Sequence, residues 1–351
     1  MHTTRGAFPT PCFMPVGTRG AVRLLAADDL ASVGARVVLA NTYHLMLRPG
    51  AALVADMGGL HRFAGWPDHL LTDSGGYQVF SLSPQVDDDG VTFRSTYDGS
   101  THRLTPRGAV RTQELLGADI QMALDGGPPL PSPPEVVRLA MERTLSWAKI
   151  ARDAHRRADQ CLFGIVQGGV SPEWRAEHAA ELAGLDFDGY GIGGLSVGET
   201  RHEMLPALAA ATAFLPADRP RYLMGVGDPV SMVEAVARGV DMFDCVLPTR
   251  LARHGTALTS AGRLPVKAAR VARDGGPIDP ECGCPVCARW SRAYLRHLFS
   301  VGEPTGGRLL TLHNLWWLLQ FVASIRAAVI DGTLNELRTA VADTWGGATL
   351  R

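Results

Sequence analysis

Short apolar stretches alternate with amphipathic stretches along residues 1–250 of the chain. Each apolar stretch ends in a polar or glycine-containing tip, and the next amphipathic stretch begins at a capping residue and ends at a glycine. In residues 105–117, Thr105 fits a helix N-cap, Pro106 the first turn and Gly117 the end. Strands that alternate with capped helices form parallel βαβ units, so this pattern predicts an α/β fold.

The number of these units indicates a closed barrel. About seven or eight units fit a (β/α)8 TIM barrel better than an open doubly wound sheet. No G-x-G-x-x-G opens a helix after the first predicted strand, which argues against a dinucleotide-binding fold. The tips of the predicted strands are Asn41, Asp73, Asp125, Gln167, Gly193–Gly194, Met224–Gly225 and Asp244. The carboxyl ends of barrel strands share one face, so these residues are expected to converge on one pocket.

Two parts of the chain depart from this alternation. Residues 86–104 carry two Asp-Gly turn signals between β-favouring residues, and they predict a small β insertion. The alternation itself ends near residue 250. We therefore expect a barrel with the active site over residues 1–265, a zinc-binding subdomain over 266–315, and C-terminal helices that close on the barrel over 316–351.

The zinc subdomain is predicted from one motif. Cys282, Cys284 and Cys287 form C-x-C-x-x-C, and His313 follows 26 positions after the last cysteine. Three thiolates and one imidazole complete a tetrahedral Zn²⁺ site and leave no position open for water. The predicted Zn²⁺ is therefore structural, and the chemistry has to lie elsewhere.

Composition and charge exclude some classes of protein. A net charge of −1 argues against a general nucleic-acid coat protein, although it permits a local basic face. Arg289, Arg292 and Arg296 have helical spacing, which fits either a phosphate-contacting stripe or a solvated surface. Half of the six cysteines belong to the metal motif, and the chain has neither a signal-peptide pattern nor a membrane-spanning apolar run. We therefore expect a cytoplasmic protein without a membrane partner.

Two of the strand-tip carboxylates, Asp73 and Asp244, are candidate catalytic groups. At the anomeric carbon of a sugar, paired carboxylates can act as nucleophile and as general acid and base. The alternative is that each caps a helix or pairs with an arginine, and spacing alone does not decide between these roles.

Two other strand tips are suited to binding a flat heterocycle. The Asp125 carboxylate can accept hydrogen bonds from the N–H groups of a guanine-like edge, and the Gln167 amide can donate one to its carbonyl. Backbone donors at Gly193–Leu195 would add to them, because glycine allows close approach. Tyr77 and Met224 could stack on the two faces of the base, although such residues in a barrel are more often part of the core.

Several long motifs together resemble one known family. They are LTDSGGYQVFSL, FGIVQGG, GGLSVGE, YLMGVG, DMFDCVLPTR and C-x-C-x-x-C with a distal histidine. In unbroken order from about Thr10 to about Ile330, the chain is similar to the tRNA-guanine transglycosylases, or queuine tRNA-ribosyltransferases, of the bacterial type.

The resemblance implies a reaction and a partner. The family exchanges the wobble guanine of tRNAs with a G-U-N anticodon for a 7-deazaguanine base, a step of queuosine synthesis. In this chain the resemblance makes Asp244 the nucleophile that forms a covalent ribosyl intermediate, and Asp73 the general acid and base. The base-binding positions would be Ser74, Tyr77, Asp125, Gln167, Gly193, Gly194, Leu195 and Met224. A structural Zn²⁺ at Cys282, Cys284, Cys287 and His313, tRNA docking by that subdomain and a homodimer also follow from the resemblance.

The identity of the incoming base depends on residues beside these positions. Val197 favours the bacterial substrate, 7-aminomethyl-7-deazaguanine. However, Asp125 is followed by Gly126–Gly127 and Pro128–Pro129 where bacterial members usually have Glu-Cys. A different 7-substituent or a different acceptor is therefore an open alternative.

Two other functions remain to be weighed. One is a paralogue that transfers 7-deazapurine bases on a non-tRNA ribosyl donor, such as a nucleoside, a nucleotide or DNA. The other is a catalytically silent protein that only binds tRNA or an active subunit. The presence of both Asp73 and Asp244 argues against the silent protein.

Overall fold

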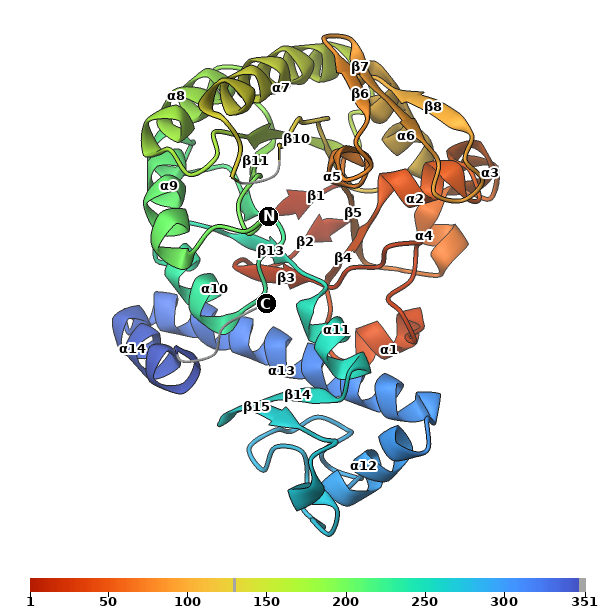
Figure 1. The fold of residues 1–351 in the computed structure, drawn as a ribbon, viewed down its shortest axis with the longest axis vertical. Coiled ribbons are helices and arrows are strands. Elements are labelled where there is room, and N and C mark those ends of the chain that lie inside the picture. Colours follow the sequence, from red (N-terminus) through yellow and green to blue (C-terminus); the bar gives the residue numbers. More distant parts are fainter. Residues whose placement is uncertain (129–130, 347–351) are drawn as a thin grey trace.

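Eight parallel strands form the centre of the computed structural model, which describes residues 1–128 and 131–346 (Figure 1). The strands are β3 (Cys12–Met14), β4 (Val37–Ala40), β5 (His69–Thr72), β9 (Ile120–Met122), β10 (Cys161–Val166), β11 (Gly189–Ile192), β12 (Arg221–Leu223) and β13 (Met242–Asp244). Their order is β3-β13-β12-β11-β10-β9-β5-β4, and a parallel bridge between Val16 and Leu39 joins the two ends of the sheet. The predicted (β/α)8 barrel is thereby confirmed.

The helices of the barrel follow its strands, and some of them begin at a side-chain cap that the sequence predicts. The helices are α1 (Ala27–Ser32), α2 (Thr42–Leu47), α3 (Ala51–Asp56), α4 (Gly59–Ala64), α5 (Gly76–Phe80), α6 (Pro106–Leu116), α7 (Pro134–Ala154), α8 (Pro172–Ala183), α9 (Arg201–Phe214), α10 (Pro229–Val236) and α11 (Leu247–Arg253). Thr105 accepts a hydrogen bond from Gly108 N at 3.0 Å, and Ser171 accepts one from Trp174 N at 3.3 Å. Each cap satisfies a backbone donor that the first turn leaves free.

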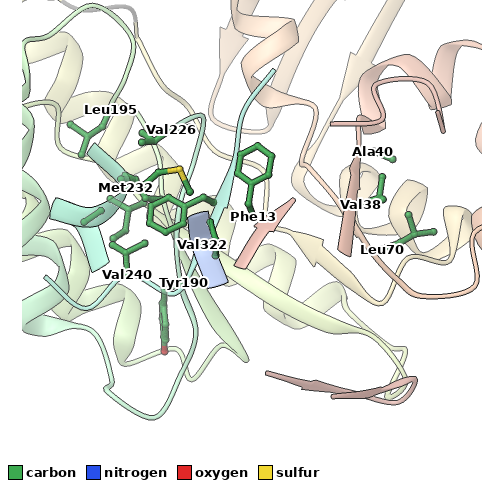
Figure 2. Close-up of a cluster of buried hydrophobic side chains, with 14 of the residues drawn as sticks. Phe13, Val38, Ala40, Leu70, Tyr190, Leu195, Val226, Met232, Val240 and Val322 are labelled. Atoms are coloured by element: carbon green, nitrogen blue, oxygen red, sulfur yellow. The ribbon is translucent and has the colours of Figure 1, made fainter. Parts of the chain in front are cut away.

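Alternate residues of each strand enter two different cores. Met14 and Leu39 point into the barrel, whereas Phe13 and Val38 pack outside it against the helices (Figure 2). This separation follows from the two-residue period of a strand. The barrel interior is therefore a packed core and not a pore.

The N-terminal hairpin of β1 (His2–Thr3) and β2 (Gly6–Ala7) covers one end of this interior. Phe8, which follows the hairpin, is 2% exposed, and its ring lies 4.8 Å from that of His69, the first residue of β5. Thr3 Oγ1 and His69 Nδ1 are 3.0 Å apart. The hairpin thus lies at the amino ends of the strands, and the opposite mouth is left for the site.

The predicted β insertion is an antiparallel sheet between α5 and α6. It consists of β6 (Gln85–Asp87), β7 (Gly90–Arg94) and β8 (Thr101–Leu104). Val91, Phe93 and Leu104 of this sheet pack with Tyr43 and Trp147 in a separate apolar cluster. The insertion is therefore anchored to α2 and α7.

The C-terminal part lies beside the barrel (Figure 1), and residues 252–310 form a small core of their own. The elements of this part are β14 (Thr256–Thr259), β15 (Gly262–Pro265), the 3-10 helix η1 (Ala269–Val271), α12 (Arg292–Ser300), α13 (Pro304–Ile330) and α14 (Leu334–Trp345). The long α13 packs against α11, α12, β14 and β3, and α14 packs against α10. Thus α14 and most of α13 pack into the core outside the barrel. The expected division after residue 315 falls within α13, and the domain boundaries stay a prediction. Within residues 1–128 and 131–346, no helix is both long and apolar enough to cross a membrane.

Candidate active site

Asp73 follows β5 directly, and four N–H donors converge on its buried carboxylate. Thr42 N and Gly75 N donate to Oδ1 at 2.9 and 3.1 Å, while Asn41 Nδ2 and Gln78 Nε2 donate to Oδ2. Burial raises the pKa of Asp73 to about 6, although these hydrogen bonds oppose the rise. A carboxyl group that titrates near neutral pH can both give and take a proton, as a general acid and base requires.

Asp244 is the last residue of β13 and differs from Asp73 in its surroundings. Its Oδ1 accepts hydrogen bonds from Tyr222 Oη at 2.6 Å and from Gly225 N at 2.8 Å. Its Oδ2 accepts none from any residue that the structure describes. The residue keeps some exposed surface, but burial of its carboxyl group raises the pKa of Asp244, and the two hydrogen bonds oppose that rise. One oxygen is thus held in place and the other is left to react.

The pKa of the Tyr222 hydroxyl is affected by both carboxylates. Burial raises the pKa of its phenol far above the usual value, and the charges of Asp244 and then Asp73 raise it further. The phenol therefore remains a hydrogen-bond donor at neutral pH. Asp73 follows β5 and Asp244 ends β13, so both lie at the carboxyl ends of parallel strands and at the same mouth of the barrel, although β3 and β4 separate their strands.

A second group of polar side chains meets beside Asp73. Ser74 Oγ donates to Asp125 Oδ1 at 3.1 Å, and Gln167 Nε2 donates to Asp125 Oδ2 at 2.7 Å. Burial raises the pKa of Asp125, and these two hydrogen bonds oppose the rise. The predicted convergence of Asp125 and Gln167 is therefore present, with an orientation that their mutual hydrogen bond holds.

Glycines allow the chain after β11 to approach this pair. A Cβ atom at Gly193 would lie 2.9 Å from Gln167 Nε2, and one at Gly194 would collide with Gln167 Oε1. Gly194 also has a φ of +64°, which favours glycine. The Leu195 side chain packs into the core outside the barrel (Figure 2), so the backbone is the part of this segment that faces the polar pair.

The two predicted stacking residues occupy different environments. Tyr77 on α5 is 72% exposed, so its ring is free to cover a bound ligand. Met224 follows β12, is half-buried and packs against the barrel interior, where Gly191 leaves room for its sulfur.

A small hollow borders Gln167 of the Asp125–Gln167 pair. It is lined by Pro128, Val137, Ala140, Gln167, Gly168, Gly169 and Gly194. A Cβ atom at Gly127 would lie 3.4 Å from Gln167 Nε2, so position 127 borders the polar pair, while Pro129 lies outside the described residues.

Some residues of the site were not recognisable from the sequence as its components. Tyr222 lies within an apolar strand pattern, which gives no indication that its hydroxyl reaches Asp244. Gln78 and Asn41 hold Asp73 from two different elements, and only the strand-end position of Asn41 pointed to the site. The fully buried Arg175 likewise left no sequence signal.

The predicted metal ligands also come together. The sulfur atoms of Cys282, Cys284 and Cys287 lie 3.6, 3.4 and 3.3 Å from His313 Nδ1, and all four ligand atoms lie within 4.8 Å of one another. His313 Nε2 is 2.8 Å from Leu258 O, which places the ring proton on Nε2 and leaves Nδ1 free for a metal. The donor set and the closed arrangement fit a structural metal ion.

Fold and site together define a (β/α)8-barrel enzyme with two differently held carboxylates at the catalytic mouth. The family model described as queuine tRNA-ribosyltransferase matches residues 1–347. Proteins named queuine tRNA-ribosyltransferase include one from Moorella thermoacetica, 51% identical over 339 residues, 96% of this chain and 91% of the relative. Another, from Herpetosiphon aurantiacus, is 53% identical over 331 residues, 94% of this chain and 84% of the relative. The chain belongs to the queuine tRNA-ribosyltransferase family, which are pentosyltransferases.

Proposed function

We propose that this protein exchanges the wobble guanine of tRNAs with a G-U-N anticodon for 7-aminomethyl-7-deazaguanine, in queuosine synthesis. The observation that carries the proposal is the difference in hydrogen bonding and environment between the two carboxylates. Asp244 has one anchored and one unengaged oxygen, and Asp73 has a pKa of about 6 at the same mouth. Family membership supports the tRNA substrate.

In the first step, Asp244 Oδ2 attacks C1′ of the ribose. The bond between C1′ and guanine N9 breaks, its electron pair leaves with the guanine, and protonated Asp73 supplies the proton that neutralises the base. The ribose is then held as an ester of Asp244. Tyr222 and Gly225 keep the attacking carboxylate oriented through its other oxygen.

In the second step, the incoming 7-deazaguanine occupies the site that guanine has left. Its N9 attacks C1′ and gives its proton to the Asp73 carboxylate, while the bond to Asp244 breaks and restores that carboxylate. Two displacements at C1′ retain its configuration. Asp125 and Gln167 would hold the heterocyclic edge, with Tyr77 and Met224 on its faces.

The proposal is tested with labelled guanine and a set of G-U-N tRNAs. The protein should incorporate label, and denaturation during turnover should leave an RNA adduct that Asp244→Asn abolishes. Failure to label any such tRNA would contradict the proposed acceptor. Labelling of a nucleoside, a nucleotide or DNA without tRNA would instead support the alternative donor, for which the glycine at position 127 beside Gln167 is the motivating observation.

We further propose that the Cys₃His cluster binds Zn²⁺ and that the protein acts as a homodimer. The four ligand atoms are close enough for one tetrahedral ion, and the imidazole is oriented by Leu258 O. The ion would brace the C-terminal part against the barrel. Metal analysis and light scattering of the purified protein test both statements.

A further inference from the structure

Arg175 on α8 has no exposed surface, and its guanidinium donates hydrogen bonds to backbone carbonyls. Nε donates to Gly169 O at 2.8 Å, and Nη1 donates to Val166 O and Gly193 O at 3.0 and 2.7 Å. Nη2 donates to Gly194 O at 3.2 Å. One side chain therefore joins the segment after β10 to the segment after β11, and both border the Asp125–Gln167 pair.

This arrangement is unusual for a buried cation. No carboxylate of the described residues forms an ion pair with Arg175. Burial lowers its pKa to about 9, with the charge of Glu199 opposing, so the group is still a cation at neutral pH. Burying a charged side chain that contacts only carbonyls costs more free energy than burying an apolar side chain in the same place. This cost indicates that Arg175 serves to hold the carbonyls in position.

The direction of these carbonyls fixes the direction of the neighbouring amides. The C=O and N–H groups of a trans peptide point opposite ways. Since Gly193 O and Gly194 O point toward Arg175, the N–H groups of Gly194 and Leu195 point away from it. Neither N–H donates to another described residue, and the φ of +64° at Gly194 lets two successive N–H groups converge on one acceptor.

The segment is held on its other side as well. Glu199 accepts hydrogen bonds from Ser196 N and, at 3.0 Å, from Val197 N. The peptide between Gly194 and Leu195 is thus fixed from both directions, next to the Gln167 amide. A base held by Asp125 would bring its ring carbonyl toward these two N–H groups.

We propose that Arg175 is a positioning residue that aims the N–H groups of Gly194 and Leu195 at the carbonyl oxygen of the bound purine or 7-deazapurine. The inference rests on the proposed base-exchange function for the identity of the ligand. Arg175 touches neither the base nor the ribose in this scheme, and it acts only through the backbone.

The test compares Arg175→Lys with a matched control, Arg221→Lys. A lysine ammonium is a single point donor and cannot span four carbonyls. Arg221 also joins two segments through carbonyls, Leu215 O and Gly239 O, but at the amino end of the barrel. Arg175→Lys should raise both the KM for guanine and the calorimetric Kd for guanine about tenfold, which is the effect of one or two misdirected hydrogen bonds. The KM for tRNA should change less than about twofold. Arg221→Lys should leave all three values within about twofold.

A measurement on the unaltered protein covers the case in which Arg175→Lys does not fold. Saturating guanine should shift the amide resonances of Gly194 and Leu195 and slow their hydrogen exchange. Unchanged amides would overturn the inference, as would a folded Arg175→Lys with the original affinity for guanine or with equal losses for guanine and tRNA. The two proposals can fail separately. If the protein exchanges no base on any tRNA but Arg175→Lys still weakens guanine binding, the proposed function is refuted and the role of Arg175 is supported.

Discussion

At the scale of single residues, two opposing effects set the pKa of Asp73. Burial raises it, the four hydrogen bonds that the carboxylate accepts lower it, and burial has the larger effect. The pKa of about 6 means that the folded protein binds this proton more tightly than the unfolded chain does. Between about pH 4 and about pH 6 the contribution of Asp73 to the free energy of unfolding therefore falls as pH rises. The site keeps a carboxylate that opposes the stability of the fold at neutral pH.

Asp73→Asn should remove this dependence. The amide stays neutral, and the buried Oε1 of Gln78, which lacks a partner in the described structure, can accept a hydrogen bond from it. Because the amide N–H₂ replaces an oxygen that accepts hydrogen bonds from two N–H donors, the variant also loses stability by an amount that does not depend on pH. Relative to the original protein, its free energy of unfolding should rise by on the order of 2 kcal/mol between pH 4 and pH 7. Urea denaturation at several pH values measures this, and a difference independent of pH would contradict it. Base exchange should be lost.

The hydrogen bond from Tyr222 to Asp244 predicts a shift in the pH dependence of catalysis. It lowers the pKa of Asp244 against the effect of burial, so Tyr222→Phe should raise that pKa. Because the nucleophile has to be ionised, the acid limb of adduct formation should move to higher pH. Tyr190→Phe is the control, since its hydroxyl donates to Ala183 O outside the barrel. Equal profiles for both variants would contradict this role.

At the scale of elements, the Cys₃His cluster joins a loop to the middle of α13. Cys284→Ser should abolish stoichiometric metal binding and lower the melting temperature, because a structural metal contributes directly to folding. Cys161→Ser, at the start of β10, should keep the metal. Metal analysis by mass spectrometry and thermal unfolding of both variants provide the measurements. A Cys284→Ser protein that retains one metal ion per chain would refute the assignment.

Elements were also the level that could be predicted well from the sequence. The βαβ repeat, the caps at Thr105 and Ser171, the β insertion and the Cys₃His cluster all follow from local periodicity, turn residues and ligand spacing. The contacts of Tyr222 and Arg175 do not, because they depend on which segments distant in sequence the barrel brings together. In the sequence, Tyr222 stands in an apolar strand pattern and Arg175 in a helix pattern, and neither pattern indicates what its polar group contacts.

At the scale of the whole molecule, the two ends of the barrel have separate tasks. Phe8 fills the amino end, and the carboxylates lie at the carboxyl end. Phe8→Ala should therefore reduce the free energy of unfolding by about 3–5 kcal/mol while the KM for guanine stays the same. Denaturant unfolding and exchange kinetics on the same preparation check this. A change in that KM with unchanged stability would contradict the separation.

The closure of the barrel has a consequence for the order in which the chain can fold. Strand β3 lies near the N-terminus, but its hydrogen-bonded neighbour is β13, whose residues follow more than two hundred positions later. Moreover, Arg326 of α13 donates to Thr10 O and Pro11 O, just before β3. On the ribosome, β3 has to wait with one edge unpaired until β13, about two thirds of the way along the chain, has emerged. The ring is thus completed late, and the C-terminal helix that carries His313 of the Cys₃His cluster also secures its first strand.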